Sequence, residues 1–161
     1  MRKAARMRPW LAIDAARISV DVAAYSFSLY SIEQALIHAF NRGVQVRMVM
    51  ESDNMDGAAV DALLKAGIPI VGDQREGLMH DKFVVIDRSE VWTGSMNFTF
   101  QGAYADNNNL LRVRSSKFAN DYTVEFEEMF TLDFWAGCAR ENTQPEHADR
   151  QRAGGSLFFT R

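Results

Sequence analysis

The first half of the chain alternates strand-like apolar runs with amphipathic helical runs, and this alternation restricts the fold more than any other feature. Residues 18–24 alternate as a half-buried strand does, and residues 44–50 form a nearly continuous apolar run. Between them, residues 31–40 have helical spacing, open with the capping box Ser31-x-x-Gln34 and stop at Gly43. The alternation predicts an α/β fold whose mixed, largely parallel β-sheet carries helices on both faces.

The rest of the chain continues this pattern with shorter elements. The predicted helices are residues 9–16 and 57–66, and the predicted strands are residues 68–71, 83–86, 91–93 and 109–113. Residues 98–106 are polar and aromatic, and we expect a loop there.

A final helix closes the domain. Its apolar side chains recur at spacings of three and four, which predicts that they face the core: Phe118, Tyr122, Phe126, Met129 and Phe130. Gly137 is the predicted end of this helix. A chain of 161 residues fits one domain, which we place at residues 1–137, followed by a polar, flexible tail at residues 138–161. Its single cysteine, Cys138, cannot form an internal disulfide.

Residues 77–97 gather the side chains that can carry chemistry. His80 and Lys82 are two residues apart and immediately precede a predicted strand, so their side chains should project the same way. Asp87 closes that strand, and a Gly-Ser-x-Asn turn follows at residues 94–97. Attack on a phosphodiester spreads negative charge over the phosphate oxygens, which Lys82, Ser95 and Asn97 are suited to stabilise. Histidine can attack phosphorus when neutral and protonate a leaving oxygen when charged.

The pattern His-x-Lys-x4-Asp, followed by Gly-Ser-x-Asn, resembles the HKD signature of the phospholipase D superfamily. The matching positions are His80, Lys82, Asp87, Gly94, Ser95 and Asn97. The flanking segments, from about Trp10 to Trp135, are similar to the small nuclease-like members that carry one copy of the motif. Many of those relatives have a glutamate where this chain has Asn108.

This resemblance implies a mechanism without metal or other cofactor. In the family, two copies of the motif meet, one histidine forms a covalent phosphohistidine, and the other acts as general acid and then as base. One copy per chain implies a homodimer with the active site on the two-fold axis. We expect His80, Lys82 and Asp87 to be catalytic, with Asp87 orienting and charge-balancing a histidine. A structural role for Asp87, in which it caps the turn at Arg88, is compatible with this expectation. Lys82, Ser95, Asn97 and Asn109 are the expected phosphate-binding residues.

The amino-acid composition says less than the motif about whether the chain binds nucleic acid or a membrane. The formal net charge is −3, which excludes a globally basic nucleic-acid binder, although local charge decides phosphate affinity. No apolar run approaches the ~20 residues needed to span a bilayer, and no export signal is visible. We therefore expect a cytoplasmic protein without stable membrane association.

Three functions remain open from the sequence. The leading hypothesis is a metal-independent endonuclease, with DNA ahead of RNA as substrate. The second is a phospholipase D or phosphatidyl transferase acting on phospholipid. The third is a non-catalytic nucleic-acid-binding module, against which the intact His80, Lys82 and Asp87 set argues.

Overall fold

The computed structural model describes residues 8–73 and 77–141, with side chains through Thr131. The strands in this part are β1 (Ser19–Ala24), β2 (Gln45–Glu51), β3 (Ile70–Asp73), β4 (Lys82–Ile86), β5 (Glu90–Gly94) and β6 (Leu110–Arg114). The helices are α1 (Pro9–Asp14), α2 (Tyr30–Asn41), α3 (Ala58–Lys65), α4 (Phe100–Tyr104) and α5 (Ser116–Glu141), with a 3-10 turn η1 (Ser52–Asn54). The predicted tail at residues 142–161 and the basic N-terminus at residues 1–7 lie outside the described residues.

The strands form one mixed sheet in the order β3-β2-β1-β4-β5-β6. β1 pairs in parallel with β2, and β2 pairs in parallel with β3. The pairings β1–β4, β4–β5 and β5–β6 are antiparallel. The mixed α/β fold is therefore confirmed, but the expectation of a largely parallel sheet is wrong. Its second half is an antiparallel meander, because short turns rather than helical crossovers join β4 to β5.

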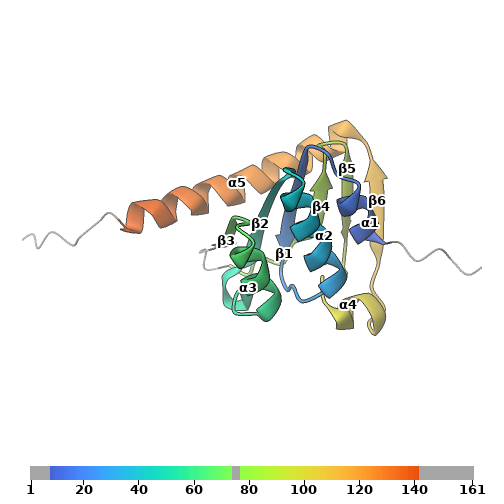
Figure 1. The fold of residues 1–161 in the computed structure, drawn as a ribbon, viewed down its shortest axis with the longest axis horizontal. Helices are drawn as coiled ribbons and strands as arrows, with labels where there is room; N and C mark the ends of the chain where they lie inside the picture. Colours follow the sequence, from blue (N-terminus) through green and yellow to red (C-terminus); the bar gives the residue numbers. More distant parts are fainter. Residues whose placement is uncertain (1–7, 74–76, 142–161) are drawn as a thin grey trace, which may run out of the picture.

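Helices cover both faces of this sheet, as the sequence predicts (Figure 1). On one face, α1, α2 and α3 pack over the larger apolar core, which includes Val20, Val22 and Trp92. On the other face, α5 packs over a smaller core through Phe126 and Met129, and Phe118, Tyr122 and Phe130 lie partly buried beside it. The predicted stripe of the last helix therefore faces the core. Every residue of β1 is buried, because this strand lies in the middle of the sheet.

The helices differ from the sequence predictions in three respects beyond shifts of one or two residues at the ends of α1 and α3. α2 begins at Tyr30 after Leu29, without a side-chain cap, so the prediction of a capping box at Ser31 and Gln34 is wrong. The predicted loop at residues 98–106 contains the short helix α4, because the Thr99 hydroxyl accepts a hydrogen bond from the Gly102 amide at 2.9 Å. α5 continues past Gly137 to Glu141, so the predicted domain boundary at residue 137 falls inside a helix.

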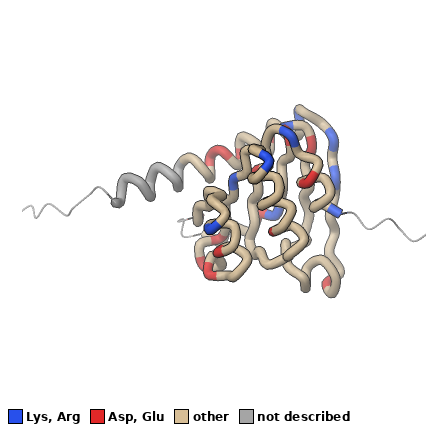
Figure 2. Tube along the Cα trace, viewed as in Figure 1, with Lys and Arg blue, Asp and Glu red and all other residues tan. Residues whose placement is uncertain are grey.

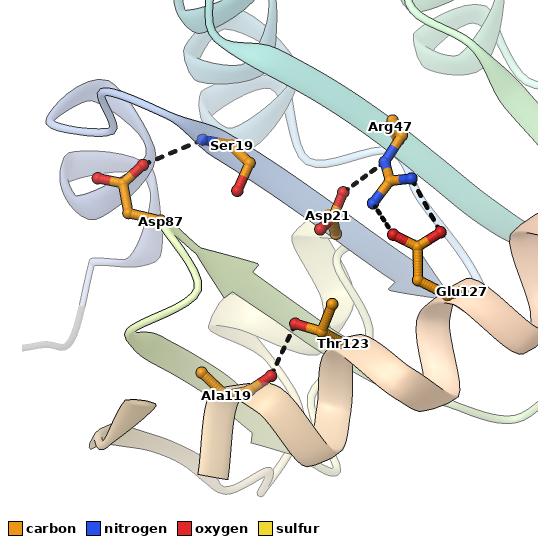
Figure 3. A network of polar contacts seen from close by, with 7 residues as sticks. All are labelled: Ser19, Asp21, Arg47, Asp87, Ala119, Thr123 and Glu127. Atoms are coloured by element: carbon orange, nitrogen blue, oxygen red, sulfur yellow. Dashed lines mark hydrogen bonds and ion pairs between the residues drawn. The ribbon is translucent and has the colours of Figure 1, made fainter. Parts of the chain in front are cut away.

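A buried ion-pair network attaches α5 to the sheet (Figure 3). Arg47 of β2 donates from Nε to Asp21 of β1 at 2.8 Å and from both terminal nitrogens to Glu127 of α5 at 3.1 and 2.7 Å. Burial raises the pKa of Asp21 in spite of the hydrogen bond from Arg47. The hydrogen bond from Arg47 lowers the pKa of Glu127, against the opposing effect of burial. One guanidinium thus ties two central strands to the covering helix.

Candidate active site

With one exception, the predicted site residues lie along one edge of the sheet, which is formed by the ends of its strands and not by an outer strand. This edge joins the carboxyl ends of β1, β2, β3 and β5 to the amino ends of β4 and β6. Lys82 at the start of β4 lies opposite Ala24 at the end of β1, and Gly94 at the end of β5 lies opposite Leu110 at the start of β6. His80, Ser95, Asn97 and Asn109 flank these strand ends. Polar side chains at strand ends can converge on a ligand without burial inside the sheet.

His80 and Lys82 form the centre of the site. The imidazole of His80 is exposed, whereas Lys82 is only 6% exposed. The Lys82 ammonium donates a hydrogen bond to the backbone carbonyl of His80 at 2.6 Å. Both side chains contact the ring of Tyr25, which confirms that they project the same way. A reactive imidazole thus stands at the surface with a cation beside it.

Burial shapes the electrostatics of Lys82. Removal from water lowers the pKa of the ammonium, and the nearby carboxylate of Asp81 opposes this shift. An ammonium has three donors, and the His80 carbonyl accepts one of them. The remaining donors can bind the oxygens of a phosphate brought to His80, in a setting where a charge is weakly screened.

Glu51 holds the segment that carries His80 and Asn54 holds the neighbouring Tyr25, and the sequence analysis assigned neither residue to the site. Glu51 ends β2 and is 5% exposed, and its carboxylate accepts a hydrogen bond from the Met79 amide at 2.6 Å. Asn54 in η1 donates to the carbonyl of Tyr25 at 2.8 Å. Their position at and just after the end of a strand was the available signal in the sequence.

The turn after β5 is held by two asparagines. The backbone N–H of Asn109 donates a hydrogen bond to Ser95 Oγ at 3.0 Å, and the side-chain oxygen of Asn109 accepts one from the backbone N–H of Ser95 at 3.1 Å. Asn108 donates from its side-chain nitrogen to the Gly102 carbonyl at 3.0 Å, so its oxygen faces Ser95. That oxygen must then accept the proton of the Ser95 hydroxyl, at 3.0 Å.

These contacts change the roles expected at this turn. Ser95 has one hydroxyl proton, which Asn108 accepts here, so Ser95 is not free to donate to a phosphate in this arrangement. Asn109 fixes the turn through its oxygen. Asn97 is half-buried, and its Oδ1 is buried without a hydrogen-bond partner among the described residues.

Asp87 is the exception, and its expected role in orienting a histidine is wrong. It lies beyond the far end of β4, roughly 20 Å from His80 at a rise of ~3.3 Å per residue. Its carboxylate accepts hydrogen bonds from the backbone amides of Arg17 at 3.1 Å, Ile18 at 2.7 Å and Ser19 at 3.1 Å. Figure 3 shows Asp87 beside Ser19, away from the ion-pair network. The residue therefore ties the β4–β5 turn to the start of β1.

The charge around the site is mainly acidic. The described acidic residues near this edge include Glu51, Asp53, Asp56, Asp73, Asp81, Asp106 and Glu125, the last of which lines the same pocket as His80. Lysine and arginine residues gather mostly at the other end of the sheet, where α5 begins (Figure 2). Among the described residues, no three His, Cys, Asp or Glu side chains are grouped to hold a metal ion. Lys82 is thus the cation that the described site itself provides.

An exposed histidine beside a buried lysine, at the open edge of an α/β sheet, defines a phosphate-handling site. The family model described as "Cardiolipin synthase, PLD-like domain" matches residues 11–130. The structure resembles the phospholipase D family member Nuc from Salmonella typhimurium, with a TM-score of 0.71 and 30% identity, over 76% of this chain and 84% of Nuc. The chain belongs to the phospholipase D superfamily, and its site is of the phosphodiesterase hydrolase type.

Other relatives agree with this assignment. The chain is 35% identical to the human mitochondrial cardiolipin hydrolase over 121 residues, which are 74% of this chain and 48% of that protein. It is 34% identical to a phospholipase D of Rickettsia bellii, over 68% of this chain and 56% of that protein. The chain therefore spans about half the length of the curated relatives it matches. NucT from Helicobacter pylori shares the fold at a TM-score of 0.66 and 21% identity, over 76% of this chain and 84% of NucT.

The expected location stays a prediction. Within residues 8–73 and 77–141, no helix combines the length and apolar character that crossing a membrane requires. Relatives such as the human cardiolipin hydrolase are named as mitochondrial proteins.

Proposed function

We propose that this chain cleaves phosphodiester bonds of nucleic acid as an endonuclease, through a phosphohistidine formed at His80 in a two-fold dimer and without a metal ion. The observation that carries the proposal is the exposed imidazole of His80 beside the buried Lys82 ammonium. The imidazole is accessible to a phosphate, and the ammonium lies where the charge of the pentacoordinate phosphorus develops.

The reaction needs two histidines. A neutral His80 nitrogen attacks phosphorus and forms the N–P bond, while the P–O bond to the leaving alcohol breaks. The leaving oxygen takes a proton from the partner subunit's His80, in its charged form. Water then attacks the phosphorus of the phosphohistidine and forms a new P–O bond, while the P–N bond to His80 breaks. The partner subunit's His80 takes a proton from that water, and a phosphomonoester leaves. Lys82 stabilises the phosphate oxygens in both steps.

His38, the other histidine in the described part of the chain, does not supply this second group. His38 is exposed near the end of α2, and its Nδ1 lies 3.7 Å from a carboxylate oxygen of Asp14. α1 and α2 place this pair away from the edge that carries His80, and His147 lies outside the described residues. In a two-fold dimer, the copy of His80 from the second subunit faces the first across the axis and supplies the second histidine that the reaction needs.

Exposed aromatic side chains near the site favour nucleic acid. Tyr30 at the start of α2 is 69% exposed, and Phe100 and Tyr104 of α4 are 68% and 47% exposed. The last two rings lie 5.0 Å apart. Unpaired bases stack on such rings at roughly 1–3 kcal/mol per base. Stacking can therefore contribute binding free energy for nucleic acid at a site whose described charged residues are mostly acidic.

The test is a cleavage assay with single- and double-stranded DNA and RNA in excess EDTA. Activity should persist in EDTA, and His80→Ala should abolish it. If subunits exchange freely, an equal mixture of wild type and His80→Ala leaves about one quarter of the dimers with two histidines, and activity per wild-type chain falls to roughly half. Loss of activity in EDTA, or unchanged activity per wild-type chain after verified exchange, contradicts the proposal.

Hydrolysis of phospholipid is the second candidate. The acidic loops repel a polyanion such as nucleic acid, and the names of the relatives include cardiolipin hydrolase and phospholipase D. Phe100→Ala separates the two candidates, since loss of a stacking ring should reduce cleavage of nucleic acid severalfold. Turnover of phospholipid vesicles, with DNA and RNA left intact, would establish the second candidate instead. Binding of nucleic acid without turnover of any phosphodiester would indicate the non-catalytic module.

A further inference from the structure

Tyr25 lies between the two reactive side chains of the site. It follows β1 directly, and its ring is half-buried. The ring meets the His80 imidazole edge to face, with centroids 4.7 Å apart and an interplanar angle of 65°. The Lys82 ammonium lies over the same ring, 4.8 Å from its centroid. One ring therefore contacts both groups that the proposed reaction uses.

The backbone of Tyr25 is fixed on both sides. Its amide donates to the Asp81 carbonyl at 3.0 Å, so the residue between His80 and Lys82 is held to it directly. Its carbonyl accepts from the Asn54 side chain at 2.8 Å. These two bonds restrain the main chain of Tyr25 and so fix the point from which its ring extends toward His80.

We propose that Tyr25 is a positioning residue whose ring holds the His80 imidazole in its reactive orientation and keeps the Lys82 ammonium beside it. The inference rests on the proposed role of His80. An edge-to-face contact restricts rotation of the imidazole, which otherwise stands exposed. The ring face attracts the ammonium, an effect that grows where water is removed, as it is around Lys82. The ring acts through these two residues and does not touch the reacting atoms.

Two substitutions distinguish the effect of the Tyr25 ring from the effect of its hydroxyl group. Tyr25→Phe keeps both ring contacts, and kcat should stay within about twofold of wild type. Tyr25→Leu removes them, and kcat should fall about 10- to 100-fold, the effect expected when a reacting group is displaced by about 1 Å. KM should change little if the ring acts through His80 and Lys82, which are the contacts that the substitution removes.

Tyr122→Leu is the matched control. Tyr122 packs its ring 5.0 Å from Phe83 of β4 on the α5 side of the sheet, so it contacts the same strand without reaching His80. Its loss should lower stability and leave kcat unchanged at temperatures where the variant is folded. Thermal unfolding of every variant identifies losses that are only structural.

A second readout does not need turnover. Proton NMR should show cross-relaxation between the ring of residue 25 and the His80 imidazole in wild type and in Tyr25→Phe. Absence of this contact overturns the inference, as does wild-type kcat in Tyr25→Leu or equal loss in Tyr25→Phe and Tyr25→Leu. If the contact is present while wild type cleaves no phosphodiester, the proposed function fails and the positioning contact stands.

Discussion

Substitution of Asp87 separates a structural role from a catalytic one. The carboxylate accepts three backbone N–H groups, from Arg17, Ile18 and Ser19. A hydrogen bond to a charged acceptor contributes about 1.5–3 kcal/mol. Arg17 and Ile18 are exposed, so water can replace the carboxylate there, and these two bonds contribute only about 1 kcal/mol each, while the bond from the buried Ser19 contributes about 1.5 kcal/mol. We expect removal of all three bonds to cost roughly 3–4 kcal/mol.

The backbone at Asp87 adds a second contribution. Its φ is +51°, in the left-handed region, and Arg88 after it has the same φ. Asp, Asn and Gly adopt this conformation readily, whereas other residues pay about 1–2 kcal/mol. Asp87→Gly should therefore cost roughly 3–4 kcal/mol and Asp87→Ala about 4–6 kcal/mol. Asp87→Asn keeps one acceptor oxygen and the backbone preference, and should cost about 1–2 kcal/mol.

Urea unfolding measures these losses, and a cleavage assay on folded protein measures kcat. With a domain stability of about 5–15 kcal/mol, Asp87→Asn and Asp87→Gly should remain folded and keep kcat close to wild type. A loss of kcat greater than about tenfold in Asp87→Asn at unchanged stability would show that this carboxylate reaches the chemistry. Equal stability of Asp87→Ala and Asp87→Gly would refute the argument from backbone strain.

Three other perturbations test the core and the site. Arg47→Met should destabilise the protein by about 3–5 kcal/mol at neutral pH, because it leaves the buried Asp21 carboxylate without its partner. Adding Asp21→Asn should recover most of that loss in urea unfolding, and an unchanged loss would contradict the reasoning. Activity should fall as pH rises through the lowered pKa of Lys82, since the ammonium then loses its charge. Lys82→Arg should move this limb of the kcat profile to higher pH, and an identical limb would exclude Lys82 as its origin. Gly102→Ala should reduce kcat severalfold, because a Cβ there would collide with the backbone of Asn97 beside the site. Wild-type kcat in this variant would show that Asn97 is not constrained by α4.

Local sequence determined the elements and the composition of the site. β-branched runs and helical spacing identified most strands and helices, because burial of one face imposes a period that a single sequence displays. The motif also identified His80 and Lys82 as partners, since neighbours two residues apart near a strand project to one side. The chemistry of the pair follows from the residue types alone.

Pairing of distant segments decided the rest. Asp87 belongs to the motif by spacing, yet the turn after β4 places its carboxylate against residues 17–19, which are far from it in sequence. No sequence motif marks Tyr25 or Glu51. They reach the site because β1 and β2 end at the edge where β4 begins. Strand order and direction depend on contacts between residues tens of positions apart. A local pattern fixes which face of a strand is buried, but not which strand lies beside it.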